Sequence, residues 1–100
     1  MGYIKIVGQV TGFHERVEEE RHWWQYFGKI VNVWSFRIER FDEAGNRLPP
    51  IQIEMRGSRF TGSIDEGDKV EIQGKWQEGK VMQVKEVTNL TTGVTIKAKG

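Results

Sequence analysis

The stretch Ile64-Asp65-Glu66-Gly67-Asp68-Lys69-Val70-Glu71-Ile72-Gln73-Gly74-Lys75-Trp76 joins a turn to a strand. The residues at 70, 72, 74 and 76 are apolar or glycine, and those between them are charged or carry an amide. Successive side chains of a strand point to opposite faces of a sheet, so a period of two predicts a half-buried strand. The Glu-Gly-Asp sequence supplies the turn before it.

Segments on both sides of this stretch predict further strands, because they alternate or are rich in β-branched and aromatic residues. They are Ile4 to Thr11, Val31 to Phe41, Ile51 to Arg56 and Val81 to Leu90, with Val94 to Lys97 as a short sixth strand or an ordered tail. Asp42 to Arg47 has the composition of a hairpin turn. Val31 and Val33 are out of phase with Trp34, which predicts a bulge or phase shift there.

The segment from Ile64 to Gly74 resembles the entry into the fourth strand of OB-fold (oligonucleotide/oligosaccharide-binding) domains. It consists of the apolar Ile64, the Glu-Gly-Asp turn and the following Val70-x-Ile72-x-Gly74. Ile6-x-Gly8-x-Val10 is similar to the first strand of these domains, so the resemblance covers nearly the whole chain. It implies that residues 1–100 form a single all-β domain, a five-stranded Greek-key barrel of the single-strand-binding type. Such barrels often bind oligonucleotides across strands two and three and the neighbouring loops.

The connection from Phe13 to Lys29 is long for a hairpin and dense in charged and aromatic residues. Val17, Glu20, Trp24 and Phe27 follow helical spacing, and Gly28 stands where helices often end, which favours a short helix in this connection. Its rings are then either exposed for recognition or buried in a second, smaller core. The sequence leaves both interpretations open.

The amino-acid composition excludes several classes of structure and function. The absence of cysteine excludes disulfide scaffolds and thiolate chemistry, and no apolar run approaches the ~20 residues that span a bilayer. We therefore expect a soluble, cytoplasmic protein that is monomeric in isolation, either complete or one module of a longer chain. Fifteen basic and fourteen acidic residues give a formal net charge of +1, so a polyanion has to be bound by a local patch.

The favoured hypothesis is a non-catalytic module that binds single-stranded nucleic acid with low sequence specificity. Rings of the long connection would stack on bases, and basic side chains would neutralise phosphates. The candidate residues are Trp23, Trp24, Tyr26, Arg37, Arg56, Arg59, Lys75 and Lys80. The alternative is a protein–protein interaction domain within a larger multidomain protein, because Trp, Tyr and Arg also dominate protein interfaces.

The expected outer face of strands two and three weighs against the favoured hypothesis. Alternation places two arginines and two glutamates there but no aromatic ring. Taken alone, such a face is typical of a solvated sheet surface with cross-strand ion pairs.

No catalytic or cofactor-binding motif is present. The sequence has no Gly-x-Ser-x-Gly elbow and no phosphate-binding Gly-Lys-Ser/Thr loop, so we expect neither an enzyme nor a cofactor.

His14, Glu18 and His22 recur every four residues and would share one face of a helix. We interpret them as the wet side of that helix rather than as metal ligands.

Overall fold

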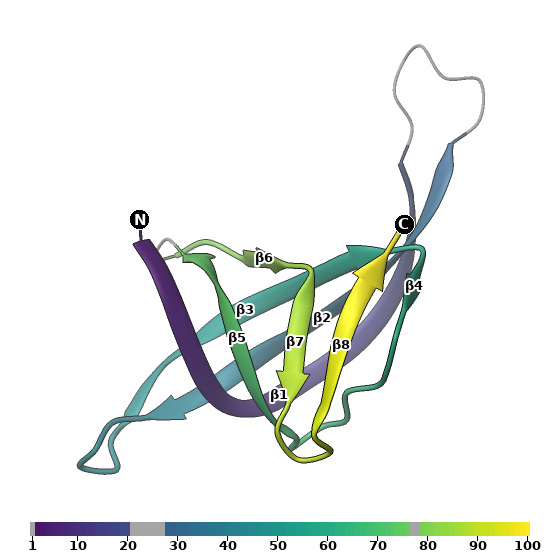
Figure 1. Cartoon of the computed structure of the whole chain (residues 1–100). Helices are drawn as coiled ribbons and strands as arrows, with labels where there is room; N and C mark the ends of the chain where they lie inside the picture. The colour runs from purple at the N-terminus through teal and green to yellow at the C-terminus, as the bar shows by residue number, and fades with distance from the viewer. Residues whose placement is uncertain (1, 21–27, 77–78) are drawn as a thin grey trace.

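The computed structural model of the chain describes residues 2–20, 28–76 and 79–100 (Figure 1). These residues form strands and no helix, which confirms the all-β prediction. The strands are β1 (Gly2–Glu20), β2 (Lys29–Phe41), β3 (Arg47–Gly57), β4 (Arg59–Phe60), β5 (Lys69–Trp76), β6 (Met82–Val84), β7 (Glu86–Asn89) and β8 (Val94–Lys99).

The strands belong to one sheet of order β4-β8-β7-β5-β1-β2-β3-β6. Among the described residues, all ladders are antiparallel except β3–β6, where Ile53 lies opposite Met82. Over the same part of the chain the sheet has eight strands rather than the predicted five, and its ladders do not close it into a barrel. The predicted strand from Val81 to Leu90 consists of β6 and β7, separated by Lys85, and the tail after Gly93 is the strand β8.

β1 links the two halves of the sheet. Its residues Gly2–Gln9 pair with β5, and those from Gln9 onward pair with β2. The register shifts between Thr11 and His14, where Gly12 has a φ of 66°, a conformation that glycine adopts at little cost. The bulge predicted near Val33 is therefore wrong. The β2–β3 register runs unbroken from Asn32 to Ile38 and shifts only beyond it, between Ile38 and Arg40, while the β1–β2 shift lies in β1.

The predicted helix is also wrong over the described part of the connection. Val17 and Glu20 belong to β1, which pairs with β2 as far as Glu20 and Lys29 to form a two-stranded ribbon (Figure 1). A short helix is marginal in water, whereas a neighbouring strand satisfies the backbone N–H and C=O groups directly. Trp24 and Phe27, the other two residues of the helical spacing, lie outside the described residues.

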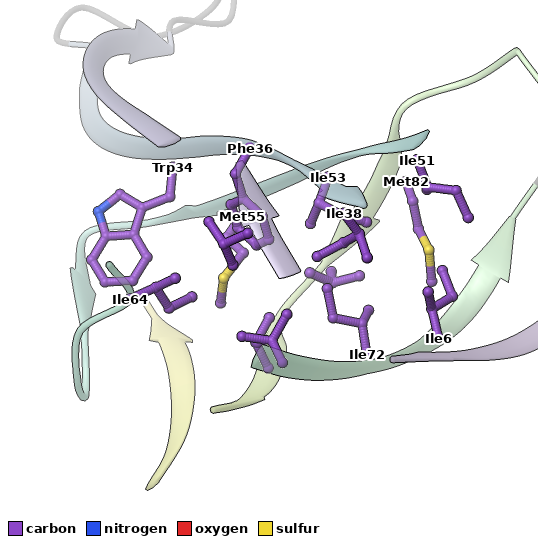
Figure 2. Close-up of a cluster of buried hydrophobic side chains, with 14 of the residues drawn as sticks. Ile6, Trp34, Phe36, Ile38, Ile51, Ile53, Met55, Ile64, Ile72 and Met82 are labelled. Carbon is purple, nitrogen blue, oxygen red and sulfur yellow. The ribbon is translucent and has the colours of Figure 1, made fainter. Parts of the chain in front are cut away.

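Figure 2 shows the core, which lies on the inner face of the curved sheet. Phe36, Ile38, Ile51, Ile53 and Met55 are each at most 1% exposed, which confirms the predicted phase of β2 and β3. The core also draws on β1, β5, β6, β7 and β8: Ile6, Val10, Val70, Ile72, Met82, Val84, Val87 and Ile96 are buried in it.

An aromatic cluster extends the core toward the ribbon. The rings of Trp34 and Phe60 stack with centroids 3.9 Å apart, and Phe13 meets Trp34 edge to face at 5.5 Å. Phe13 is thus part of the hydrophobic packing and not of an exposed platform.

Candidate functional site

A groove of about 250 Å³ lies between the start of β3 and the connection from β5 to β6. Its lining residues are Pro50, Ile51, Gln52, Trp76, Gly79, Lys80 and Val81. The groove therefore combines a large aromatic ring, an amide and an ammonium group at one edge of the core.

Trp76 is the last residue of β5 and continues the inward phase of Val70 and Ile72. It is partly buried against the core and also lines the groove, while Lys80 and Val81 are exposed. Trp76 is not among the site residues that the sequence predicts. The available signal was its position: an inward ring on the final residue of a strand, next to a glycine turn, lies at an open end of the core.

Gln52 connects this groove to Arg37. The two residues are partners in the β2–β3 register, and the Gln52 amide donates to Ser35 Oγ at 2.9 Å. Arg37 is exposed on the same outer face. Of the predicted cations, Lys80 thus lies in the groove and Arg37 lies across the strand pair beside it.

The guanidinium of Arg37 lies over the backbone of Gly12. A Cβ at Gly12 would come within 2.8 Å of both terminal nitrogens of Arg37, so the bulge glycine makes room for this cation. The carboxylate of Glu66 accepts the N–H groups of Phe13 at 3.0 Å and of Gly12 at 2.9 Å. These hydrogen bonds, with a smaller contribution from the charge of Arg37, lower the pKa of Glu66 below its usual range.

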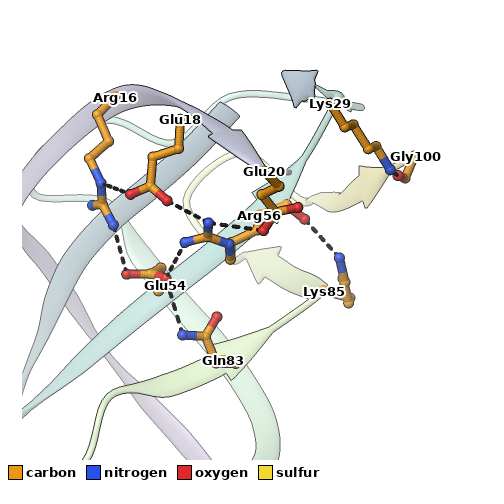
Figure 3. A network of polar contacts seen from close by, with 9 residues as sticks. All are labelled: Arg16, Glu18, Glu20, Lys29, Glu54, Arg56, Gln83, Lys85 and Gly100. Carbon is orange, nitrogen blue, oxygen red and sulfur yellow. Dashed lines mark hydrogen bonds and ion pairs between the residues drawn. The ribbon is translucent and has the colours of Figure 1, made fainter. Parts of the chain in front are cut away.

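Arg56 lies elsewhere, in the network shown in Figure 3. Its guanidinium contacts Glu18 at 2.5 Å, Glu54 at 2.9 Å and Glu20 at 3.1 Å. Arg16 joins the same network through Glu18 at 2.6 Å and Glu54 at 3.2 Å. Three carboxylates already surround Arg56, so this predicted phosphate ligand is neutralised within the molecule.

The network also explains why two valines on the outer face are buried. Val31 is 3% exposed and Val33 is 0% exposed, although they lie opposite in phase to Phe36. Val33 is the register partner of Arg16 on one side and of Arg56 on the other. The aliphatic stems of long charged side chains cover apolar surface in this way.

The network makes folding stability sensitive to acid. Hydrogen bonds from Arg56 and Arg16 lower the pKa of Glu18, and those from Gln83, Arg56 and Arg16 outweigh burial and lower the pKa of Glu54. The unfolded chain then binds more protons than the folded one below a pH of about 4.5. The stabilisation of the folded state by these ion pairs is therefore complete above that pH and is lost as the pH falls.

We expect urea unfolding at pH 7 and pH 3.5 to show a smaller acid-induced decrease in the free energy of unfolding for Glu54→Gln than for the wild type. An equal loss would contradict the assignment, and Glu43→Gln in the exposed hairpin turn is the control.

Two other predicted cations, Arg59 and Lys75, do not line the groove. Arg59 is exposed on β4, opposite Lys99 of β8, and Lys75 is exposed in the outward phase of β5, opposite to that of Trp76. Trp23, Trp24 and Tyr26 lie outside the described residues.

The spacing of His14 and Glu18 has a different meaning on β1 than on a helix. Four residues span about 13 Å along a strand, too far for two side chains to share one ion. His22 lies outside the described residues, and the described part of the chain has no group of three metal-ligating side chains.

No protein-family model, curated protein or solved structure matches the chain. Within residues 2–20, 28–76 and 79–100, no helix is long and apolar enough to cross a membrane.

Proposed function

We propose that this protein is an OB-type module that binds single-stranded nucleic acid with little sequence preference. The strand pairing supports the OB-type part of the proposal. If β6 and β7 are taken as one strand bent at Lys85, that strand pairs in parallel with β3 and antiparallel with β5. In the sheet order β7-β5-β1-β2-β3-β6, the two halves of that bent strand lie at opposite ends, as a five-stranded OB-type arrangement would require. β4 and β8 are additions to this arrangement.

The placement of Trp76 and Lys80 in one groove carries the functional proposal. Stacking of a base on an aromatic ring contributes about 1–3 kcal/mol and tolerates any base, because every base has a flat face. The ammonium of Lys80 would bind a neighbouring phosphate, and the groove offers the Gln52 amide as one further polar contact. Few base-edge contacts follow from this set, which is why we propose low sequence specificity.

Arg37 extends the proposed path beyond the groove. It lies on β2 opposite Gln52 and forms no ion pair within 4.0 Å among the described residues. A strand passing from the groove over Gln52 would place a phosphate near Arg37. Arg56 takes no part in this revised site, since its charge is already matched.

The test is the affinity of a labelled oligothymidylate, measured by fluorescence anisotropy over a range of salt concentrations. We expect binding to weaken as salt rises, with a slope that falls by about one for Lys80→Gln, since each phosphate contact releases counterions. Trp76→Leu should weaken binding about tenfold or more at every salt concentration. Lys97→Gln is the matched control, because Lys97 already pairs with Glu86 at 3.6 Å. Equal binding by Lys80→Gln, Trp76→Leu and the control would refute the proposed site.

One observation favours the alternative, a protein-interaction domain. Val17 and Ile30 are 63% and 57% exposed, and the register places them diagonally across the ribbon on one face. Exposed apolar side chains that share one face of a projecting ribbon offer a surface that a protein partner could cover. If the wild type binds no oligonucleotide at low salt, this alternative becomes the leading hypothesis.

A further inference from the structure

A second groove, of about 500 Å³, lies where β1 passes from its pairing with β5 to its pairing with β2 (Figure 1). Its lining residues are Val7, Gly8, Gln9, Glu39, Arg40, Phe41 and Lys69. None of them lines the groove of Trp76 and Lys80. Gly8 is required for this crossing, since a Cβ there would overlap the carbonyl oxygen of Glu39.

The charges of this groove favour an anion. Glu39 is the acidic residue of its lining, and it is matched by Arg47 at 2.8 Å. Arg40 and Lys69 therefore leave the groove positive. Arg40 donates from Nη2 to the carbonyl of Pro49 at 3.2 Å, but its Nε is buried without a partner among the described residues. Arg40 therefore contributes its positive charge to the groove, and the exposed Lys69 ammonium is the cationic group that an anion can contact directly.

The same groove offers apolar surface beside these cations. Phe41 is 56% exposed and Val7 is 41% exposed, so both side chains are accessible to a ligand. An exposed aromatic ring in the same groove as an ammonium group suits a ligand that joins an anionic group to a flat ring. A simple inorganic anion would leave the ring unused, and an uncharged ring would leave the cations unused.

We propose that this groove binds one nucleotide unit. Its phosphate accepts hydrogen bonds from the Lys69 ammonium, and its base packs against Phe41. The same chemistry is presented by a free nucleoside monophosphate and by one nucleotide of a strand. The volume is within the usual range of small-ligand pockets, about 300–1,000 Å³.

Titrations followed by backbone amide chemical shifts test this proposal with four probes: adenosine monophosphate, adenosine, inorganic phosphate and a short oligothymidylate. We expect saturable shifts at Val7–Gln9, Arg40–Phe41 and Lys69. Adenosine monophosphate should bind at least about tenfold more tightly than adenosine or phosphate, because each of these lacks one of the two contacts. Shifts at these amides with the oligonucleotide alone would assign the groove to a strand, and shifts with adenosine monophosphate would assign it to a free nucleotide.

The double variant Phe41→Ala, Lys69→Gln should lose these shifts, and both positions are exposed, so the fold should be retained. Lys97→Gln again serves as the control. Failure of this proposal is distinguishable from failure of the proposed function, because Lys80→Gln should weaken oligonucleotide binding without changing the shifts at Phe41. The nucleotide proposal is overturned if none of the probes shifts these amides, or if the double variant binds as tightly as the wild type.

Discussion

Replacing Phe36 by alanine is expected to lower the free energy of unfolding by about 3–5 kcal/mol. Phe36 is 0% exposed in the middle of β2, and its ring stacks on Phe13 with centroids 6.1 Å apart. Removing the ring forfeits its transfer from water and leaves a cavity that the surrounding strands fill only in part. A domain of this size is stable by only about 5–15 kcal/mol, so the variant should be close to unfolding.

Urea unfolding followed by circular dichroism measures this effect, with Phe41→Ala as the control on the same strand. Phe41 is 56% exposed, so its truncation should change stability by less than about 1 kcal/mol. Similar losses for the two variants would mean that β2 does not direct Phe36 into the core as described.

Asn89→Ala should produce the second large loss, about 2–4 kcal/mol. Asn89 is the last residue of β7 and is 0% exposed. Its side chain forms hydrogen bonds with Ser63, with Asp68 and with the turn at Thr91 and Thr92. Its amide donates to Asp68 at 2.7 Å and to the carbonyl of Ser63 at 3.4 Å, and its oxygen accepts the N–H groups of Thr91 and Thr92. Truncation removes all four contacts and leaves partners without hydrogen bonds.

Two measurements separate this loss from a simple change of packing. The Thr91 and Thr92 amides should exchange with solvent faster in Asn89→Ala than in the wild type, because both lose their acceptor. Asn46→Ala, in the exposed β2–β3 turn, is the control and should have little effect on stability. Unchanged exchange at both threonines would contradict the role of Asn89.

These two variants should also affect ligand binding, because residues that belong to the core or are held by its neighbouring hydrogen bonds line both grooves. Ile51 and Trp76 line the first groove and also belong to or pack against the core. Lys69 lines the second groove, and its backbone N–H donates to the hydroxyl of Thr91, next to the Asn89 contacts. Binding in either groove therefore depends on an intact core.

Part of the candidate site was predictable and part was not. Alternation placed Arg37 and Arg56 on one outer face, which the structure bears out. Their different surroundings were not predictable, because Glu18 and Glu20 meet Arg56 only when β1 continues as a ribbon beside β2. Trp76 was not predictable as a site residue, because a period of two gives the face of a residue but not its distance from the open end of the sheet.

The sequence by itself determined which face of each regular strand is buried, where the main turns fall, and that the domain is built from strands. These features depend on the order of apolar and polar residues over a few positions, which is local information. Only the tertiary structure decided the length of β1, the place of its bulge, the covering of Val33 by charged side chains and the two grooves. Each of these depends on which distant strand lies alongside, since a ladder partner or a facing charge can outweigh the weak local preference of a short segment.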